Sequence, residues 1–124
     1  MEYTKCNREQ LDEFLFNSQI HDSKIVDMYY GFSDSTLKIK AFNSIDSVTY
    51  NFIFIDVQLE LVIKSKGIGS QDTIISLTIE PDYSYLAKYI KGNYINEDCL
   101  YLVFQMFSGD ELHIISKAVD LEVS

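Results

Sequence analysis

The chain has 124 residues, of which 47% are hydrophobic and 23% are charged, with only 5 Gly and 1 Pro. This length predicts one domain over residues 1–124, and the composition excludes a disordered, fibrous or low-complexity chain. The 19 acidic residues outnumber the 10 basic ones and give a formal net charge of −9, which argues against binding to nucleic acid or to a membrane surface.

The first element expected along the chain is a helix. Leu11, Phe14 and Leu15 recur at the spacing of one helix face, and Asn7 suits the N-cap position. We therefore expect a helix over about 7–18. The start of the chain has no apolar stretch typical of a secretory signal, so we expect a reduced, cytoplasmic protein.

Most of the remaining chain is rich in β-branched and aromatic residues, which favour strands. Strands are expected at 24–32 and 36–42, and a turn at 33–35 would join them into a hairpin. The second strand alternates Leu37, Ile39 and Ala41 with Lys38 and Lys40. That alternation is typical of a strand with one buried face.

The long apolar segment at 47–64 changes its pattern near Asp56. Before Asp56 the apolar set is even-numbered, as at Phe52 and Phe54, and after it the set is odd-numbered, as at Val57 and Leu59. A regular strand buries side chains of one parity. The change therefore predicts a bulge or a corner near Asp56, giving either two strands or one sharply bent strand.

The rest of the chain predicts a loop, a strand, a short helix and two further hairpin strands. The loop covers 64–72, and the strand at 73–80 places Ile75, Leu77 and Ile79 on one face. The tyrosine-rich segment at 82–91 reads as a short helix or as an edge strand. A hairpin of 100–107 with 111–116 follows, with Leu112 and Ile114 directed inward, and a strand runs to the end of the chain.

The predicted fold is therefore mainly β: an antiparallel sheet of about seven strands with an N-terminal helix and one short helix. The pattern leaves open whether the sheet closes into a barrel, stays curved or forms a sandwich.

The sequence offers few groups for catalysis or for metal binding. His21 and His113 are the only histidines, and the pair His21-Asp22 lies at a helix-to-strand junction without further ligands. We interpret that pair as structural. Gly67 and Gly69 lack the rest of a phosphate-binding loop. A hydrolase would need a cleft in which histidine and carboxylates converge.

The two cysteines, Cys6 and Cys99, have no metal-site spacing, although one bridge between them is arithmetically allowed. Cys99 precedes an apolar run and is expected to be buried. We predict no catalytic residue, no metal site and no cofactor.

The acidic excess concentrates in the last third of the chain. Residues 92–124 carry six acidic side chains against one basic side chain, Lys117. We predict that they gather on one face and contact a basic protein partner, whereas the alternative is a solvated surface that only maintains solubility. The six residues are Glu97, Asp98, Asp110, Glu111, Asp120 and Glu122.

Three short segments carry a resemblance to known proteins. Residues 18–25 read SQIHDSKI, with a hydrophobic-His-Asp-Ser junction between helix and strand, and FIDV at 54–57 and SGD at 108–110 follow. In this pattern the chain resembles a set of small, poorly characterised bacterial proteins, some of them counted among the immunity proteins of toxin systems. The resemblance implies a β-rich fold and no functional residues.

The leading expectation is a non-enzymatic interaction protein, in its most concrete form an acidic immunity-type inhibitor of a basic toxin domain. The alternative is a small-molecule or carbohydrate-binding module that uses a tyrosine-lined sheet face. The tyrosines in question are Tyr29, Tyr30, Tyr83, Tyr85, Tyr89, Tyr94 and Tyr101.

Overall fold

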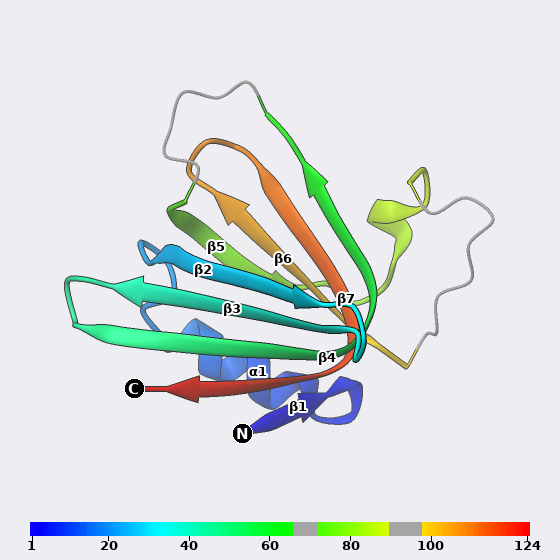
Figure 1. Ribbon diagram of the computed structural model, residues 1–124, viewed down its shortest axis with the longest axis horizontal. Coiled ribbons are helices and arrows are strands. Elements are labelled where there is room, and N and C mark those ends of the chain that lie inside the picture. The colour runs from blue at the N-terminus through cyan, green and yellow to red at the C-terminus, as the bar shows by residue number, and fades with distance from the viewer. Residues whose placement is uncertain (66–71, 90–97) are drawn as a thin grey trace.

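A computed structural model describes residues 1–65, 72–89 and 98–124 and shows one antiparallel sheet of seven strands that does not close into a barrel (Figure 1). The mainly β fold with an N-terminal helix is confirmed. The strands are β1 (Glu2–Thr4), β2 (Lys24–Gly31), β3 (Thr36–Asn43), β4 (Val48–Ile63), β5 (Ile74–Ile79), β6 (Leu100–Met106) and β7 (Glu111–Val123).

Two long strands hold the sheet together. The order is β2-β3-β4-β7-β6-β5, and β1 adds to the last part of β7. The first half of β4 pairs with β3, and both halves pair with β7. In Figure 1 both β4 and β7 turn back at the right of the view, so that the sheet folds over on itself.

The predicted irregularity near Asp56 is confirmed as a bulge within one bent strand. Asp56 has a φ of 53°, and the register of β4 against β7 shifts between Val57 and Leu59. Phe52 and Phe54 belong to one cluster of buried side chains, and Val57, just past Asp56, packs against the same cluster. Leu59 and Leu61 pack against a second cluster on the opposite face. The apolar parity changes first at Asp56, and the register shift after Val57 then turns Leu59 to the other face.

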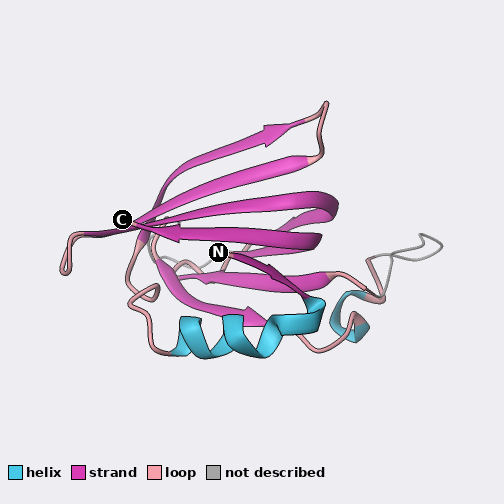
Figure 2. Ribbon diagram, turned by 90° about the horizontal axis from the view of Figure 1, so that it is seen from below, coloured by secondary structure: helices cyan, strands magenta, loops and turns pink. Residues whose placement is uncertain are grey.

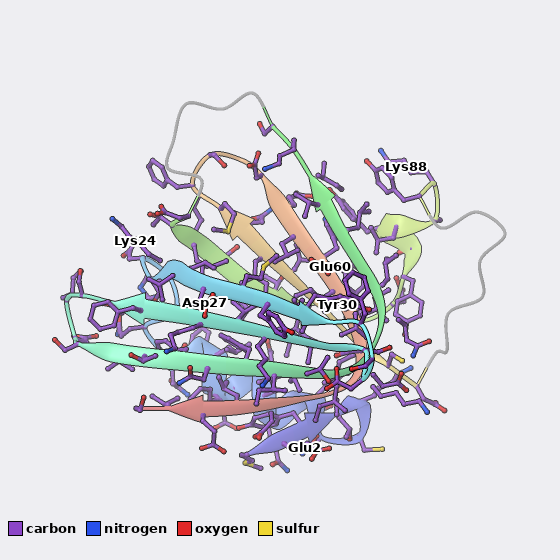
Figure 3. The ribbon with its side chains drawn as sticks, in the orientation of Figure 1. Glu2, Lys24, Asp27, Tyr30, Glu60 and Lys88 are labelled. Carbon is purple, nitrogen blue, oxygen red and sulfur yellow. The ribbon has the colours of Figure 1, made fainter. Side chains whose placement is uncertain are left out.

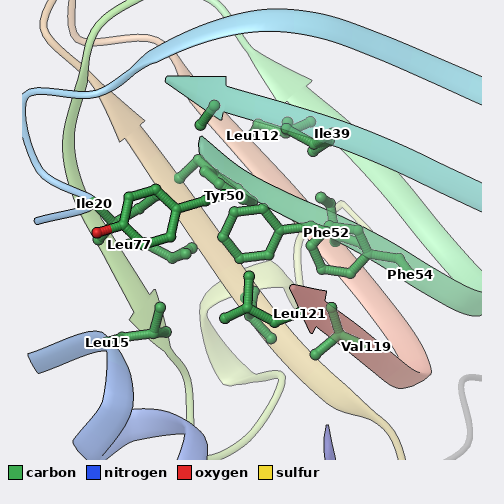
Figure 4. Close-up of a cluster of buried hydrophobic side chains, with 14 of the residues drawn as sticks. Leu15, Ile20, Ile39, Tyr50, Phe52, Phe54, Leu77, Leu112, Val119 and Leu121 are labelled. Atoms are coloured by element: carbon green, nitrogen blue, oxygen red, sulfur yellow. The ribbon is translucent and has the colours of Figure 1, made fainter. Parts of the chain in front are cut away.

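The larger of these clusters, which we call the main cluster, fills the concave side of the sheet (Figure 4). The helix closes one side of it: a 3-10 turn (η1, Lys5–Asn7) leads into α1 (Arg8–Phe16), and Leu11 and Leu15 are buried. Figure 2 shows α1 lying along the edge of the folded sheet. Members of the main cluster include Leu15, Ile20, Ile39, Tyr50, Phe52, Phe54, Leu77, Leu112, Val119 and Leu121.

The second cluster lies on the other face of β6 and β7, beneath a short 3-10 helix (η2, Ser84–Leu86). In place of the helix expected over 82–91, the described part of this segment forms only the 3-10 helix η2, in which Leu86 alone is buried. Residues 90 and 91 of the expected helix lie outside the described residues. The second cluster consists of Leu86, Cys99, Tyr101, Val103 and Ile115.

The interior face of β5 also differs from the prediction. Ile74 and Leu77 are buried, while Ile75 is 48% exposed. The pairing of β5 with β6 shifts its register between Ile74 and Ser76. This bulge removes the simple alternation that the sequence pattern assumes.

Candidate functional site

The strand β2 lies at an edge of the sheet and leaves one of its own edges unpaired. It pairs with β3 along its length. On its other side a single bridge joins Lys24 to Thr73, and the Ile25 N–H donates to the Asp72 carbonyl at 2.8 Å. Within the described residues, no strand pairs with this side of β2 beyond Ile25. Residues 26–31 therefore present an open row of backbone donors and acceptors.

A second unpaired edge belongs to the distal half of β4. Its pairing with β3 ends where Leu37 lies opposite Phe54, and the Val57 N–H then donates to the Ser35 carbonyl at 2.8 Å. Past that bond, β4 pairs with β7 alone in the described part of the chain. Both open edges start near the turn between β2 and β3 and diverge from it (Figure 1). We call these two open edges, residues 26–31 and residues 58–63, together with the pocket that lies between them, the slot.

An apolar pocket of about 240 Å³ occupies the wide end of the slot. Its apolar lining comes from both open edges and from the β6–β7 hairpin. Lys64, Asp72 and Asp110 add two carboxylates and one ammonium, whereas the Glu111 carboxylate bonds to His113 on the opposite face of β7. The lining residues are Ile25, Met28, Val62, Met106 and Leu112, with Lys64, Asp72, Asp110 and Glu111.

Asp110 anchors this end of the slot rather than facing solvent. It is 5% exposed, its Oδ1 accepts a hydrogen bond from the Ser65 N–H at 2.6 Å, and its Oδ2 lies 3.6 Å from the Lys64 Nζ. Gly109, with a φ of 94°, makes the preceding turn that such a backbone requires. Asp110 thus ties the β6–β7 hairpin to the end of β4.

Glu60 lies on the slot side of distal β4. It pairs with Ile114, a member of the main cluster, so its side chain is directed toward the concave side. No hydrogen bond or ion pair joins it to any other described residue. The carboxylate keeps contact with solvent, yet partial burial among its neighbours raises its pKa. Figure 3 labels it together with Tyr30 of β2.

The sequence analysis missed a buried polar network on the opposite face. The Tyr101 hydroxyl lies 2.7 Å from the His113 Nδ1, and the His113 Nε2 lies 2.9 Å from the Glu111 Oε1. Because a carboxylate only accepts, Nε2 donates to Glu111 and Nδ1 accepts from Tyr101. Glu111 also accepts from the Tyr85 hydroxyl at 3.1 Å and from the Gln105 amide at 3.4 Å.

The network joins η2 to β6 and β7. His113 is 0% exposed and Tyr101 is 1% exposed, while Tyr85, which stacks on His113, is 55% exposed. Burial raises the pKa of Glu111, but hydrogen bonds from His113, Tyr85 and Gln105 outweigh it and lower the pKa overall. The sequence signal was the spacing of Glu111 and His113, which are two residues apart and share one face of a strand.

The six acidic residues proposed as a binding face do not lie together. Glu97 falls outside the described residues, and Asp98 is exposed beside the second cluster. Asp120 and Glu122 lie 3.1 and 2.9 Å from the N-terminal ammonium of Met1. They lie near the end of β7, whereas Glu111 is its first residue, and β7 turns back between them (Figure 1).

The other candidate residues remain apart. His21 is exposed, and Asp22 turns the chain with a φ of 68°. Cys6 is exposed, Cys99 is buried, and both are free thiols; burial raises the pKa of Cys99. Over the described ranges, no three His, Cys, Asp or Glu side chains gather in a way that could hold a metal ion. Gly67 and Gly69 fall outside these ranges.

The tyrosines fall into two groups. Tyr83, Tyr85 and Tyr101 gather around the second cluster, where the ring centroids of Tyr83 and Tyr101 lie 6.0 Å apart and Tyr85 stacks on His113. Tyr29 and Tyr30 belong to β2. Tyr94 lies outside the described residues.

Comparison with known proteins gives no family for this chain: no protein-family model, no curated protein and no solved structure matches it. Among the described helices, none has the length and apolar character needed to cross a bilayer. The candidate site therefore rests on the geometry of the slot.

Proposed function

We propose that this chain is a protein-interaction module that accepts an extended segment of a partner along the open edge of β2. The observation that carries the proposal is the exposure of that edge. Val26, Met28 and Tyr29 are 55%, 43% and 65% exposed, although strand residues of this kind are normally packed. An unpaired strand edge with exposed apolar side chains is the usual receptor for strand addition.

The size of the edge sets what backbone pairing can supply. Half of the six residues at 26–31 direct their N–H and C=O outward, which allows up to about six hydrogen bonds. Each contributes a net stabilisation of only about 1 kcal/mol. Backbone pairing alone is therefore weak and unselective, and side-chain contacts in the slot must supply the rest.

The charge of the slot favours a basic partner. The carboxylates of Asp72 and Asp110 and the ammonium of Lys64 line the pocket at its wide end, Glu60 lies further in, and the whole chain carries a net charge of −9. A basic segment is attracted at long range by this field. An immunity-type inhibitor of a basic toxin domain is one protein of this class, and it remains a prediction that the net negative charge of the chain supports.

A small-molecule binder is the weaker reading. The slot pocket of about 240 Å³ falls below the ~300–1,000 Å³ that is usual for ligand sites, and a larger hollow of about 400 Å³ lies outside the slot, beside Tyr83 and Cys99. The pocket also opens between two unpaired strand edges, a setting that suits a peptide backbone.

The test uses affinity capture with three full-length baits: the natural chain, Met28→Lys on β2, and Phe16→Lys on α1. Phe16 is 87% exposed and lies outside the slot, so it controls for the added charge. We expect a partner bound by the natural chain and by Phe16→Lys to be lost by Met28→Lys. In the purified complex, the amides of β2 should become protected from hydrogen exchange. A partner that Met28→Lys retains with unchanged affinity would contradict the proposal.

A further inference from the structure

Glu60 is a charged side chain of the slot that makes no hydrogen bond or ion pair with the other described residues. Its neighbours on the slot side are apolar: Ile114 lies opposite it in the β4–β7 pairing, and Val62, two residues along β4, lies opposite Leu112. On β2, Met28 pairs with Ile39 and Tyr30 pairs with Leu37, two members of the main cluster. Met28 and Tyr30 therefore approach the slot from the other side.

Partial burial makes the charged form of the Glu60 carboxylate less favourable, and no other described residue compensates with a hydrogen bond or an ion pair. The other acidic side chains around the slot have roles: Asp110 accepts from the Ser65 N–H, and Glu111 accepts from three side chains. Glu60 has no such bond, and its surroundings disfavour its charged form. A polar or neutral side chain at this exposed strand position would avoid the cost.

We propose that Glu60 is the specificity-determining residue of the slot and binds the cationic side chain of a Lys or Arg in the docked partner segment. This inference rests on the proposed strand addition at β2. A segment paired with the open edge of β2 directs every second side chain into the slot. One of these side chains faces Glu60.

The register then gives the partner segment a minimal motif. Val62 and Met28 line the pocket at the wide end, and Val62 lies two residues from Glu60 along β4. Side chains on one face of a strand repeat every two residues, about 6.8 Å. The pocket lies on the wide side of Glu60, so a segment with a basic residue at Glu60 should carry an apolar residue on that side, and the test peptides carry one two positions away in both directions.

The experiment uses three labelled nine-residue peptides of sequence VTVTXTVTV, in which X is Lys, Glu or Ser. Affinities are measured by fluorescence anisotropy for the natural chain, Glu60→Gln, Glu60→Lys and Glu9→Lys. Glu9 lies on α1, so Glu9→Lys makes the same change of net charge away from the slot. Hydrogen exchange of the β2 amides reports whether each peptide pairs with the open edge.

The natural chain should bind the lysine peptide about three- to tenfold more tightly than the glutamate peptide, as for a partly exposed ion pair. Glu60→Gln should remove the difference, Glu60→Lys should reverse it, and Glu9→Lys should preserve it. If all peptides protect β2 with equal affinity, or if Glu9→Lys acts like Glu60→Lys, the role of Glu60 is overturned while strand addition stands. If no peptide protects β2, the proposed function fails as well.

Discussion

The strands β2 and β3 are neighbours of equal length, but their apolar side chains differ in exposure. Each has eight residues, and they pair along one hairpin. In β3, Leu37, Ile39 and Ala41 are at most 1% exposed, whereas Val26 and Met28 of β2 remain 55% and 43% exposed. The strand β3 has a partner on each side and the main cluster beneath it; β2 has a partner on one side only.

The comparison separates two reasons for an apolar strand. The apolar residues of β3 are accounted for by the packing of the chain itself. Those of β2 are buried only in part by the chain, and an exposed apolar edge is a liability that proteins usually cover or interrupt with charge. We infer that the apolar residues of β2 serve a partner.

The largest expected effect comes from truncating one residue in each strand. Ile39→Ala should lower the free energy of unfolding by about 2–4 kcal/mol, because the site is fully packed. Met28→Ala should cost less than about 1 kcal/mol, because much of its side chain is already in water. Urea denaturation measures both, and equal losses would show that β2 packs as tightly as β3.

The polar network of Tyr101, His113 and Glu111 tests packing on the other face of the sheet, beside the second cluster. His113→Leu should cost about 1–3 kcal/mol, since it leaves the buried Tyr101 hydroxyl without its partner and removes one of the side-chain donors to Glu111. Adding Tyr101→Phe to this variant should cost less than Tyr101→Phe alone in the natural chain, because the two groups share one bond. Strict additivity in the double-mutant cycle would refute the network.

The bend that separates the two halves of β4 depends on a left-handed residue. Asp56 has a φ of 53°, and Asp tolerates that conformation better than a β-branched residue does. Asp56→Val should therefore cost about 1–2 kcal/mol, while Asp56→Gly should change stability by less than about 1 kcal/mol. Thermal unfolding distinguishes the two variants, and equal destabilisation would place the cause in the lost carboxylate, which lies 3.7 Å from the Lys117 Nζ.

The smallest effect is the pH dependence conferred by Glu60. Because its pKa is raised in the folded state, its contribution favours folding at low pH and is lost as the pH rises through the folded pKa. The difference in free energy of unfolding between Glu60→Gln and the natural chain should grow in favour of Glu60→Gln as the pH rises through the folded pKa of Glu60. Above that pH the difference should stay constant. A difference that shrinks with rising pH would mean that Glu60 has a cationic partner in the free protein.

Periodicity was enough to predict the local elements. The alternation of Leu37, Ile39 and Ala41 identified β3, and the parity change at Asp56 identified the bulge. The pattern did not reveal that β4 and β7 each run through the bend as one strand, because strand continuity depends on pairing with distant residues. The three-residue strand β1 was also missed, since it exists only through its pairing with residues 118–120 of β7.

The candidate site was harder to predict for the same reason. The slot is defined by strands that lack a neighbour, and the absence of a neighbour is a property of topology, which periodicity does not report. The predicted acidic face took no account of position along β7: Glu111 and Asp120 belong to the same strand but lie toward opposite ends of it. Asp110, one of the six acidic residues of that prediction, is buried because the chain just after β4 supplies its hydrogen-bond donor.

The most direct test of the central claim is hydrogen exchange of β2 and β3 in the same sample, with and without the lysine peptide. In the free protein the outward amides of residues 26–31 should exchange quickly, while the amides of β3, paired on both sides, should exchange slowly. Adding the peptide should slow exchange in β2 and leave β3 unchanged. Slow exchange of all β2 amides in the free monomer, or protection that appears elsewhere in the chain, would contradict the account.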